Sequence, residues 1–268
     1  MMLWGVALPD APATAVEREY LEAVARRWPQ PITLEQMWAL TDEAWDACGA
    51  SVERLDSPEV AAFYRHPVWL VNGVFADVHA ESCAHREALA AWVAASGRLR
   101  IVDFGGGYGA LARRIAARIP GADIRIVDPF PSGLSVACCA GVPQVRYVAA
   151  IDEPAEILVA QDVLEHVADP VGLAAQLVRQ VRPGGYLVFA NHFKPSIKCH
   201  VPSTFHLDRT FPALMALLGC TFRERVPGCE HALVFERRRE AMARPWRLAL
   251  FERGSRLRDR VARTLRGA

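Results

Sequence analysis

Residues 98–117 have the sequence RLRIVDFGGGYGALARRIAA. An apolar run ends in an acid, glycines follow at every second position, and a helical pattern then begins. The run is short and contains the β-branched Ile101 and Val102, which predicts a parallel strand buried on both faces. Asp103 then lies at the carboxyl end of this strand, where open α/β sheets bind their ligands. The alternate glycines predict a turn where the backbone takes positive φ and closely approaches a ligand: Gly105, Gly107 and Gly109.

A second strand is predicted at residues 124–129, IRIVDP. It ends in Asp128, where a carboxylate can accept hydrogen bonds from both ribose hydroxyls of an adenosine ligand. The glycine turn also fits G-x-G-x-x-A, a dinucleotide-binding pattern. These two segments alone leave NAD and S-adenosylmethionine (SAM) as open alternatives.

Two later segments favour SAM. Residues 157–170, ILVAQDVLEHVADP, and 181–191, VRPGGYLVFAN, follow the turn in order. Together the segments resemble class I SAM-dependent methyltransferases of the small-molecule type. The resemblance implies an α/β fold with a Rossmann-like sheet, mostly parallel with an antiparallel last strand, and SAM as cofactor. An NAD-dependent reductase is disfavoured because no Tyr-x-x-x-Lys or comparable hydride-site pattern follows the turn.

The resemblance also implies where SAM lies. Its ribose is expected on Asp128 and its methionine end over the glycine turn near Asp103. Many relatives place an adenine-binding acid directly after the third strand, but here the apolar run 145–151 delays it to Asp152. The expected cofactor residues are Asp103, Gly105, Gly107, Gly109, Asp128, Asp152 and Asp162.

The composition of the chain limits the kinds of molecule that we expect it to bind. A formal net charge of +1 over 268 residues favours a small-molecule acceptor over nucleic acid. The sequence has no apolar run long enough for a membrane span, and its start lacks the charged region of a signal peptide. Seven cysteines without a C-x-x-C pair are typical of a reducing cytoplasm.

Three regions are predicted along the chain. Residues 1–96 form a helical cap over the substrate, in which segment 66–77, HPVWLVNGVFAD, has an Asn-Gly turn at its centre. Residues 97–238 form the SAM-binding core, with an insert at 192–210. Residues 239–268 form a basic amphipathic helix whose stripe contains Trp246, Leu250, Leu257, Val261 and Leu265. We expect this stripe to pack on the domain or on a second subunit, in a homodimer formed through the cap or this helix. Binding to anionic lipid or another acidic surface is the alternative.

The insert contains three histidines next to the predicted methyl-transfer site: His192, His200 and His206. His192 leaves the end of a strand and is the candidate general base, because an imidazole titrates near neutral pH. The alternatives are a divalent metal site, which matches no tight ligand spacing, and a structural role in the loop. We expect no metal.

The methyl group is expected to point toward a pocket formed by Asp162, His166, His192 and three aromatic cap residues: Tyr64, Trp69 and Phe75. His166 is a second catalytic candidate, with pocket lining as the alternative role, and His200 and His206 are expected to contact the substrate. The predicted function is O-methylation of a small molecule. The alternative from another class is a SAM-binding partner, sensor module or enzyme of a different SAM-assisted reaction.

Overall fold

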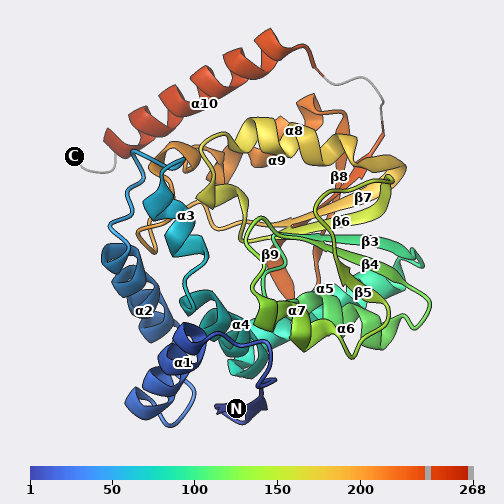
Figure 1. The fold of residues 1–268 in the computed structure, drawn as a ribbon. Helices are drawn as coiled ribbons and strands as arrows, with labels where there is room; N and C mark the ends of the chain where they lie inside the picture. Colours follow the sequence, from blue (N-terminus) through green and yellow to red (C-terminus); the bar gives the residue numbers. More distant parts are fainter. Residues whose placement is uncertain (239–242, 265–268) are drawn as a thin grey trace.

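The computed structural model describes residues 1–238 and 243–264, which contain a seven-stranded sheet with helices on both faces (Figure 1). The strand order is β5-β4-β3-β6-β7-β9-β8. Strands β3 to β7 pair with one another in parallel, whereas β9 is antiparallel to both β7 and β8. The bounds are β3 Arg100–Phe104, β4 Asp123–Val127, β5 Val145–Tyr147, β6 Ala155–Gln161, β7 Val181–Ala190, β8 Cys220–Val226 and β9 Cys229–Arg237. The predicted fold class is confirmed.

Two helix layers bury the sheet. Helices α5 (Ala80–Ala95), α6 (Ala110–Arg118) and α7 (Gly133–Cys139) cover one face, and α8 (Pro170–Arg179) and α9 (Leu207–Leu217) cover the other. Leu89 and Val93 of α5 pack in the same buried cluster as Ile101 and Ile124 of the sheet. Helix α5 is therefore part of a sheet-covering layer, although it lies within the region predicted as the cap. The division into domains stays a prediction.

Residues 181–185, VRPGG, contain turn-forming residues but lie inside a strand. Strand β7 already includes them, pairing Val181 with Ala155 before an irregularity, after which Tyr186 pairs with Ile157. Gly184 adopts a φ of 76° within this irregularity, a conformation that glycine adopts without steric cost. The two glycines of this segment are thus accommodated inside the strand.

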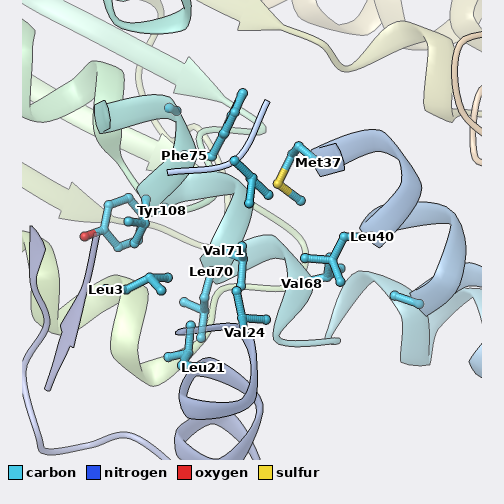
Figure 2. Close-up of a cluster of buried hydrophobic side chains, with 14 of the residues drawn as sticks. Leu3, Leu21, Val24, Met37, Leu40, Val68, Leu70, Val71, Phe75 and Tyr108 are labelled. Atoms are coloured by element: carbon cyan, nitrogen blue, oxygen red, sulfur yellow. The ribbon is translucent and has the colours of Figure 1, made fainter. Parts of the chain in front are cut away.

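The N-terminal region packs helices around its own apolar core (Figure 2). It contains a short hairpin, β1 Met2–Leu3 and β2 Val6–Ala7, followed by α1 Ala15–Arg27, α2 Leu34–Ala47, α3 Pro58–Tyr64 and α4 Val68–Val78. Thr14 and Thr33 begin α1 and α2 with capping boxes, in which the threonine side chain and the third helical residue satisfy each other's backbone N–H groups.

The predicted Asn-Gly turn is wrong, because α4 runs without a break through Asn72 and Gly73. Glycine serves close packing here: a Cβ on Gly73 would lie 2.3 Å from Cβ of Tyr108. Figure 2 shows Tyr108 beside α4 residues of this core. The apolar character of this segment therefore belongs to a buried helix.

The C-terminal helix α10 spans Pro245–Thr264 and lies outermost, beside α9 (Figure 1). Of the two expected packing partners of its apolar stripe, the domain is wrong, because Trp246, Leu250, Leu257 and Val261 are all exposed in the single chain. The opposite face makes the contact, through Leu248, Phe251 and Ser255. The predicted stripe residue Leu265 and residues 239–242 lie outside the described part of the chain.

None of the helices in the described part of the chain combines the length and apolar character needed to cross a bilayer. All seven cysteines are free thiols.

Candidate active site

The glycine turn follows β3 directly, and its alternate glycines all have positive φ. The φ angles of Gly105, Gly107 and Gly109 are 72°, 48° and 77°. A Cβ at Gly105 would lie 2.6 Å from Val163 Cγ2, and one at Gly109 would lie 2.5 Å from Cys139 Sγ. At Gly107, by contrast, the nearest atoms to a Cβ are 4.0 Å away. The outer glycines therefore pack against protein, whereas Gly107 lines open space that a ligand can fill.

Asp128 directly follows β4 beside this turn, in agreement with the predicted strand end. Its Oδ2 accepts a 2.9 Å hydrogen bond from Gly107 N, and its Oδ1 accepts one of 2.8 Å from Phe130 N. A small hollow nearby is lined by residues including Tyr64, Trp69, Gly107, Phe130 and Ser132. The turn and the acid have the positions expected of an adenosine-binding site at the carboxyl edge of the sheet.

Asp103 lies beneath the turn rather than in the hollow. It is 2% exposed, and a Cβ on the neighbouring Gly106 would lie 2.7 Å from its Oδ2. Burial raises the pKa of Asp103 to about 7, while the positive charge of Arg86 opposes that shift. Its Oδ2 has no hydrogen-bond partner among the described residues. Asp103 therefore supports the turn from below.

Arg86 of α5 was missed in the sequence analysis. Its charge interacts with Asp103, Asp162 and Asp77, and burial lowers its pKa. A single arginine within an ordinary helical pattern gives no local signal of such a role. Only the packing of α5 beneath the sheet brings this cation to the acids at the strand ends.

Asp162 connects the ends of two neighbouring strands. It follows β6, its N–H donates a 2.7 Å hydrogen bond to Ala190 O at the end of β7, and its side chain is exposed. Its φ is 54°, which is uncommon for a residue with a side chain. Such strained positions cluster at functional sites because the surrounding structure holds them in place.

Glu165 is the second site residue that the sequence analysis missed, although it lies in the quoted LEHV segment. Its side chain is fully buried, and Oε1 accepts a 2.6 Å hydrogen bond from His192 N. Burial, reinforced by the negative charge of Asp162, raises the pKa of Glu165 to about 8. Its Oε2 is buried and has no partner within residues 1–238 and 243–264. Glu165 therefore fixes the start of the insert to the 3₁₀ turn Leu164–His166.

His192 lies at the end of β7, as predicted. Its Nε2 shares a 2.6 Å hydrogen bond with Ser196 Oγ, and burial lowers its pKa. The ring is therefore neutral at neutral pH and can accept a proton. His200 lies beside it, with ring centroids 5.7 Å apart, and pairs through Nδ1 with Lys194 O at 2.7 Å.

His166 is surrounded by rings. Its centroid lies 4.9 Å from His200, 6.3 Å from Tyr64 and 6.2 Å from Trp69. Burial lowers the pKa of His166 to about 3, so the ring is neutral. Its Nδ1 and the Tyr64 hydroxyl are buried without a hydrogen-bond partner among the described residues. The structure thus brings Tyr64, Trp69, His166, His192 and His200 into one polar-aromatic cluster.

Three predicted site residues lie away from both this cluster and the glycine turn. Phe75 is buried in the cap core, stacked on His79 at 4.5 Å. His206 lies under α10, where its carbonyl accepts a hydrogen bond from Ser255 Oγ at 3.2 Å. Asp152 forms an ion pair with Arg125 of β4, because segment 148–154 has to return to the start of β6 without a helix.

The metal alternative took His192, His200 and His206 as ligands, but these three histidines do not form a group of neighbouring ligand atoms in the described part of the chain. The described residues contain two other groups whose ligand atoms lie within 4.8 Å of one another. These groups are His85, Cys229 and His231, and Glu165, His166 and His200. The expectation of no metal stays a prediction.

Comparison with known proteins gives the family. Residues 75–260 match the family described as methyltransferase domain. A stretch of 105 residues, 34% of this chain, is 37% identical to a ubiquinone biosynthesis O-methyltransferase of Methylobacterium sp. (strain 4-46), and covers 40% of that protein. A longer stretch, 53% of this chain, is 28% identical to the ubiquinone biosynthesis O-methyltransferase of Paracidovorax citrulli (strain AAC00-1), and covers 64% of it.

A solved structure shares the fold. An O-methyltransferase family protein from Burkholderia thailandensis superposes with a TM-score of 0.55 at 14% identity, covering 81% of this chain and 76% of that one. The family match extends over more than half of the chain and includes the glycine turn, Asp128, Asp162 and the insert. The chain therefore belongs to the methyltransferase domain family, and S-adenosylmethionine is its cofactor.

Proposed function

We propose that the protein transfers the methyl group of SAM to a hydroxyl oxygen of a small-molecule acceptor. The observation that supports this most directly is the meeting of three strand ends. Strands β3, β6 and β7 are parallel neighbours, so the glycine turn, Asp162 and His192 lie along one edge of the sheet. That edge is where cofactor and acceptor sites meet in α/β folds.

The proposed cofactor residues are the glycine turn, Asp128 and Asp162. Bound SAM supplies an electrophilic methyl group that needs no further activation. The task left to the protein is to hold the acceptor oxygen in line and exclude water, and orientation of this kind is worth up to about 7–11 kcal/mol. Asp103 and Arg86 support the turn from beneath the sheet.

His192 is proposed as the general base. Its ring is neutral, half-buried and fixed by Ser196 on one nitrogen, and its backbone is fixed by Glu165. Removal of the acceptor's hydroxyl proton by such a base contributes about 10²–10⁴ in rate. His166, with a pKa of about 3, stays neutral and is proposed to contact the acceptor as a hydrogen-bonding group.

The acceptor is proposed to be a hydroxylated ring. Tyr64 and Trp69 stack at 5.6 Å, and Tyr64 also stacks on Phe130 at 5.8 Å. Planar ligands pack well on such faces. The buried, unpartnered polar atoms of Tyr64 and His166 provide hydrogen-bonding sites for hydroxyl groups. The names of the relatives, which are O-methyltransferases, support oxygen as the methylated atom.

The same proposal includes a cytoplasmic location and an acceptor that is not nucleic acid. The free cysteines and the near-neutral net charge support these two points. A homodimer through the cap remains a proposal that sedimentation velocity can test.

The test has two steps. Calorimetric titration with SAM, S-adenosylhomocysteine and NAD is expected to show binding of the first two only. Transfer of a labelled methyl group is then measured on a panel of phenols, catechols and aliphatic polyols, with the ring compounds expected to accept it. Tight NAD binding contradicts the cofactor assignment. SAM binding without transfer to any hydroxylated acceptor favours the alternative of a binding module.

A further inference from the structure

Helix α10 contacts the domain with one face and presents its large apolar side chains on the opposite, outer face. The buried position is a polar residue, Ser255, which is 4% exposed and shares a 2.7 Å hydrogen bond with Thr210 Oγ1. The large apolar side chains point outward instead: Trp246 is 58% exposed, Leu250 57%, Leu257 59% and Val261 51%. At 3.6 residues per turn, these four residues share one stripe opposite Ser255.

The charges of α10 are also asymmetric. Arginines border the outward stripe on both sides, Arg247 and Arg258 on one and Arg253 and Arg260 on the other. The acids Glu252 and Asp259 lie toward the domain, and Glu252 pairs with Arg256 at 2.5 Å. The outer face therefore presents an apolar centre with positively charged borders.

We propose that this outer face of α10 binds the surface of an anionic lipid bilayer. The stripe enters the boundary between headgroups and acyl chains, where tryptophan is favoured, and the arginines reach the lipid phosphates. The helix lies in the plane of the interface and does not span it. Because Figure 1 shows α10 on the outside of the α8–α9 layer, the face meets a flat surface without moving the domain.

A second copy of the chain fits this face less well. Pairing of two α10 helices would cover the stripes, but it would also bring the arginine borders of the two copies together. The carboxylates of α10, on Glu252 and Asp259, lie on the side of the helix that faces the domain. Charge complementarity thus favours an anionic partner over a second basic helix.

The test is co-sedimentation of the full chain with vesicles of phosphatidylcholine alone or with added phosphatidylglycerol. We expect binding only to the anionic vesicles, weakened by salt. Leu257→Ser is expected to lower the partition coefficient about fivefold, because it removes apolar burial. Arg258→Gln is expected to lower it about fivefold as well.

Matched controls lie elsewhere on the surface. Leu99 is 48% exposed at the start of β3, and Arg54 is exposed in the cap, so Leu99→Ser and Arg54→Gln are expected to leave vesicle binding unchanged. Circular dichroism verifies that each variant is folded. All four variants are expected to bind SAM as the wild type does, since none touches the proposed active site.

Three results would overturn the proposal: no binding of folded protein to anionic vesicles, equal binding to neutral and anionic vesicles, or a dimer in solution that Leu257→Ser dissociates. Vesicle binding by a protein that transfers no methyl group would sustain this proposal and contradict only the proposed function.

Discussion

The backbone N–H of His192 donates a 2.6 Å hydrogen bond to the buried carboxylate of Glu165. The carbonyl of Glu165 in turn accepts a 2.8 Å hydrogen bond from Val201 N. One buried acid thus holds both the first residue of the insert and a point nine residues later. The position of the proposed base depends on a residue that need not touch the substrate.

Glu165→Ala is expected to lower the free energy of unfolding by about 1–3 kcal/mol, because it leaves the His192 N–H buried without a partner. Glu165→Gln keeps an oxygen acceptor and is expected to lower the free energy of unfolding by a smaller amount. Urea denaturation at one pH measures both. Equal losses for the two variants would show that this hydrogen bond does not carry the effect.

The pH dependence of stability should change with Glu165→Gln. The folded pKa of Glu165 is about 8, against 4.5 for an unperturbed glutamate. Between these values the folded protein holds a proton that the unfolded chain releases, so the free energy of unfolding falls as the pH rises through this window. The glutamine cannot titrate, so its stability relative to the wild type is expected to increase with pH. Parallel pH profiles would contradict the raised pKa.

His192→Ala is expected to lower kcat about 10²–10³-fold and leave the Kd for SAM nearly unchanged. Because burial lowers the pKa of His192 from its usual 6.5, wild-type activity should rise with pH along a limb centred below that value. Steady-state kinetics across the acid range measure both effects. Ser196→Ala is the control, since it removes only the partner of Nε2. Lost SAM affinity in His192→Ala would indicate a structural role instead.

Gly107→Ala is expected to weaken SAM binding at least about tenfold, because a methyl group would enter the open space beside the turn. Gly97→Ala is a matched control, since Gly97 has a φ of 69° and no atoms within 4 Å of its Cβ position. Both substitutions carry a similar left-handed strain of about 1–2 kcal/mol. Calorimetric titration measures the SAM affinity of both variants. Equal affinities would show that Gly107 is not part of the cofactor site.

Asp42→Ala is expected to raise KM for the acceptor several-fold without changing the Kd for SAM. Its Oδ1 accepts a 2.7 Å hydrogen bond from Lys198 N, which fixes the insert to α2 of the cap beside His200. Asp46→Ala breaks only the exposed ion pair with the Lys198 side chain and should change stability by less than about 1 kcal/mol. If both variants leave KM unchanged, the insert needs no anchoring to the cap.

Asp152→Asn is expected to leave SAM affinity within about twofold of the wild type, because Asp152 pairs with Arg125 at an exposed position. Asp128→Ala, which releases both Gly107 and Phe130, is expected to weaken it strongly. A large loss of affinity in Asp152→Asn would restore its predicted role in binding adenine.

The sequence predicted the features whose causes are local. Alternating glycines require positive φ, and a short β-branched run forms a buried strand, so the turn and the strand ends carrying Asp128, Asp162 and His192 were predicted correctly. Segment 66–77 was predicted wrongly because Asn-Gly is a strong local turn signal, and only the approach of Tyr108 explains a glycine inside α4. Arg86 gave no local signal at all.

By itself, the sequence determined a Rossmann-like sheet, with a glycine turn and acids at the carboxyl ends of its strands, and a basic amphipathic helix at the end of the chain. The tertiary structure decided which side chains meet at that edge and which face of the helix is covered. It joined Glu165 to His192, separated Phe75 and His206 from the site, and turned the stripe of α10 outward. The physical reason is that periodicity and backbone preference act within a few residues, whereas packing and burial depend on segments far apart in the chain.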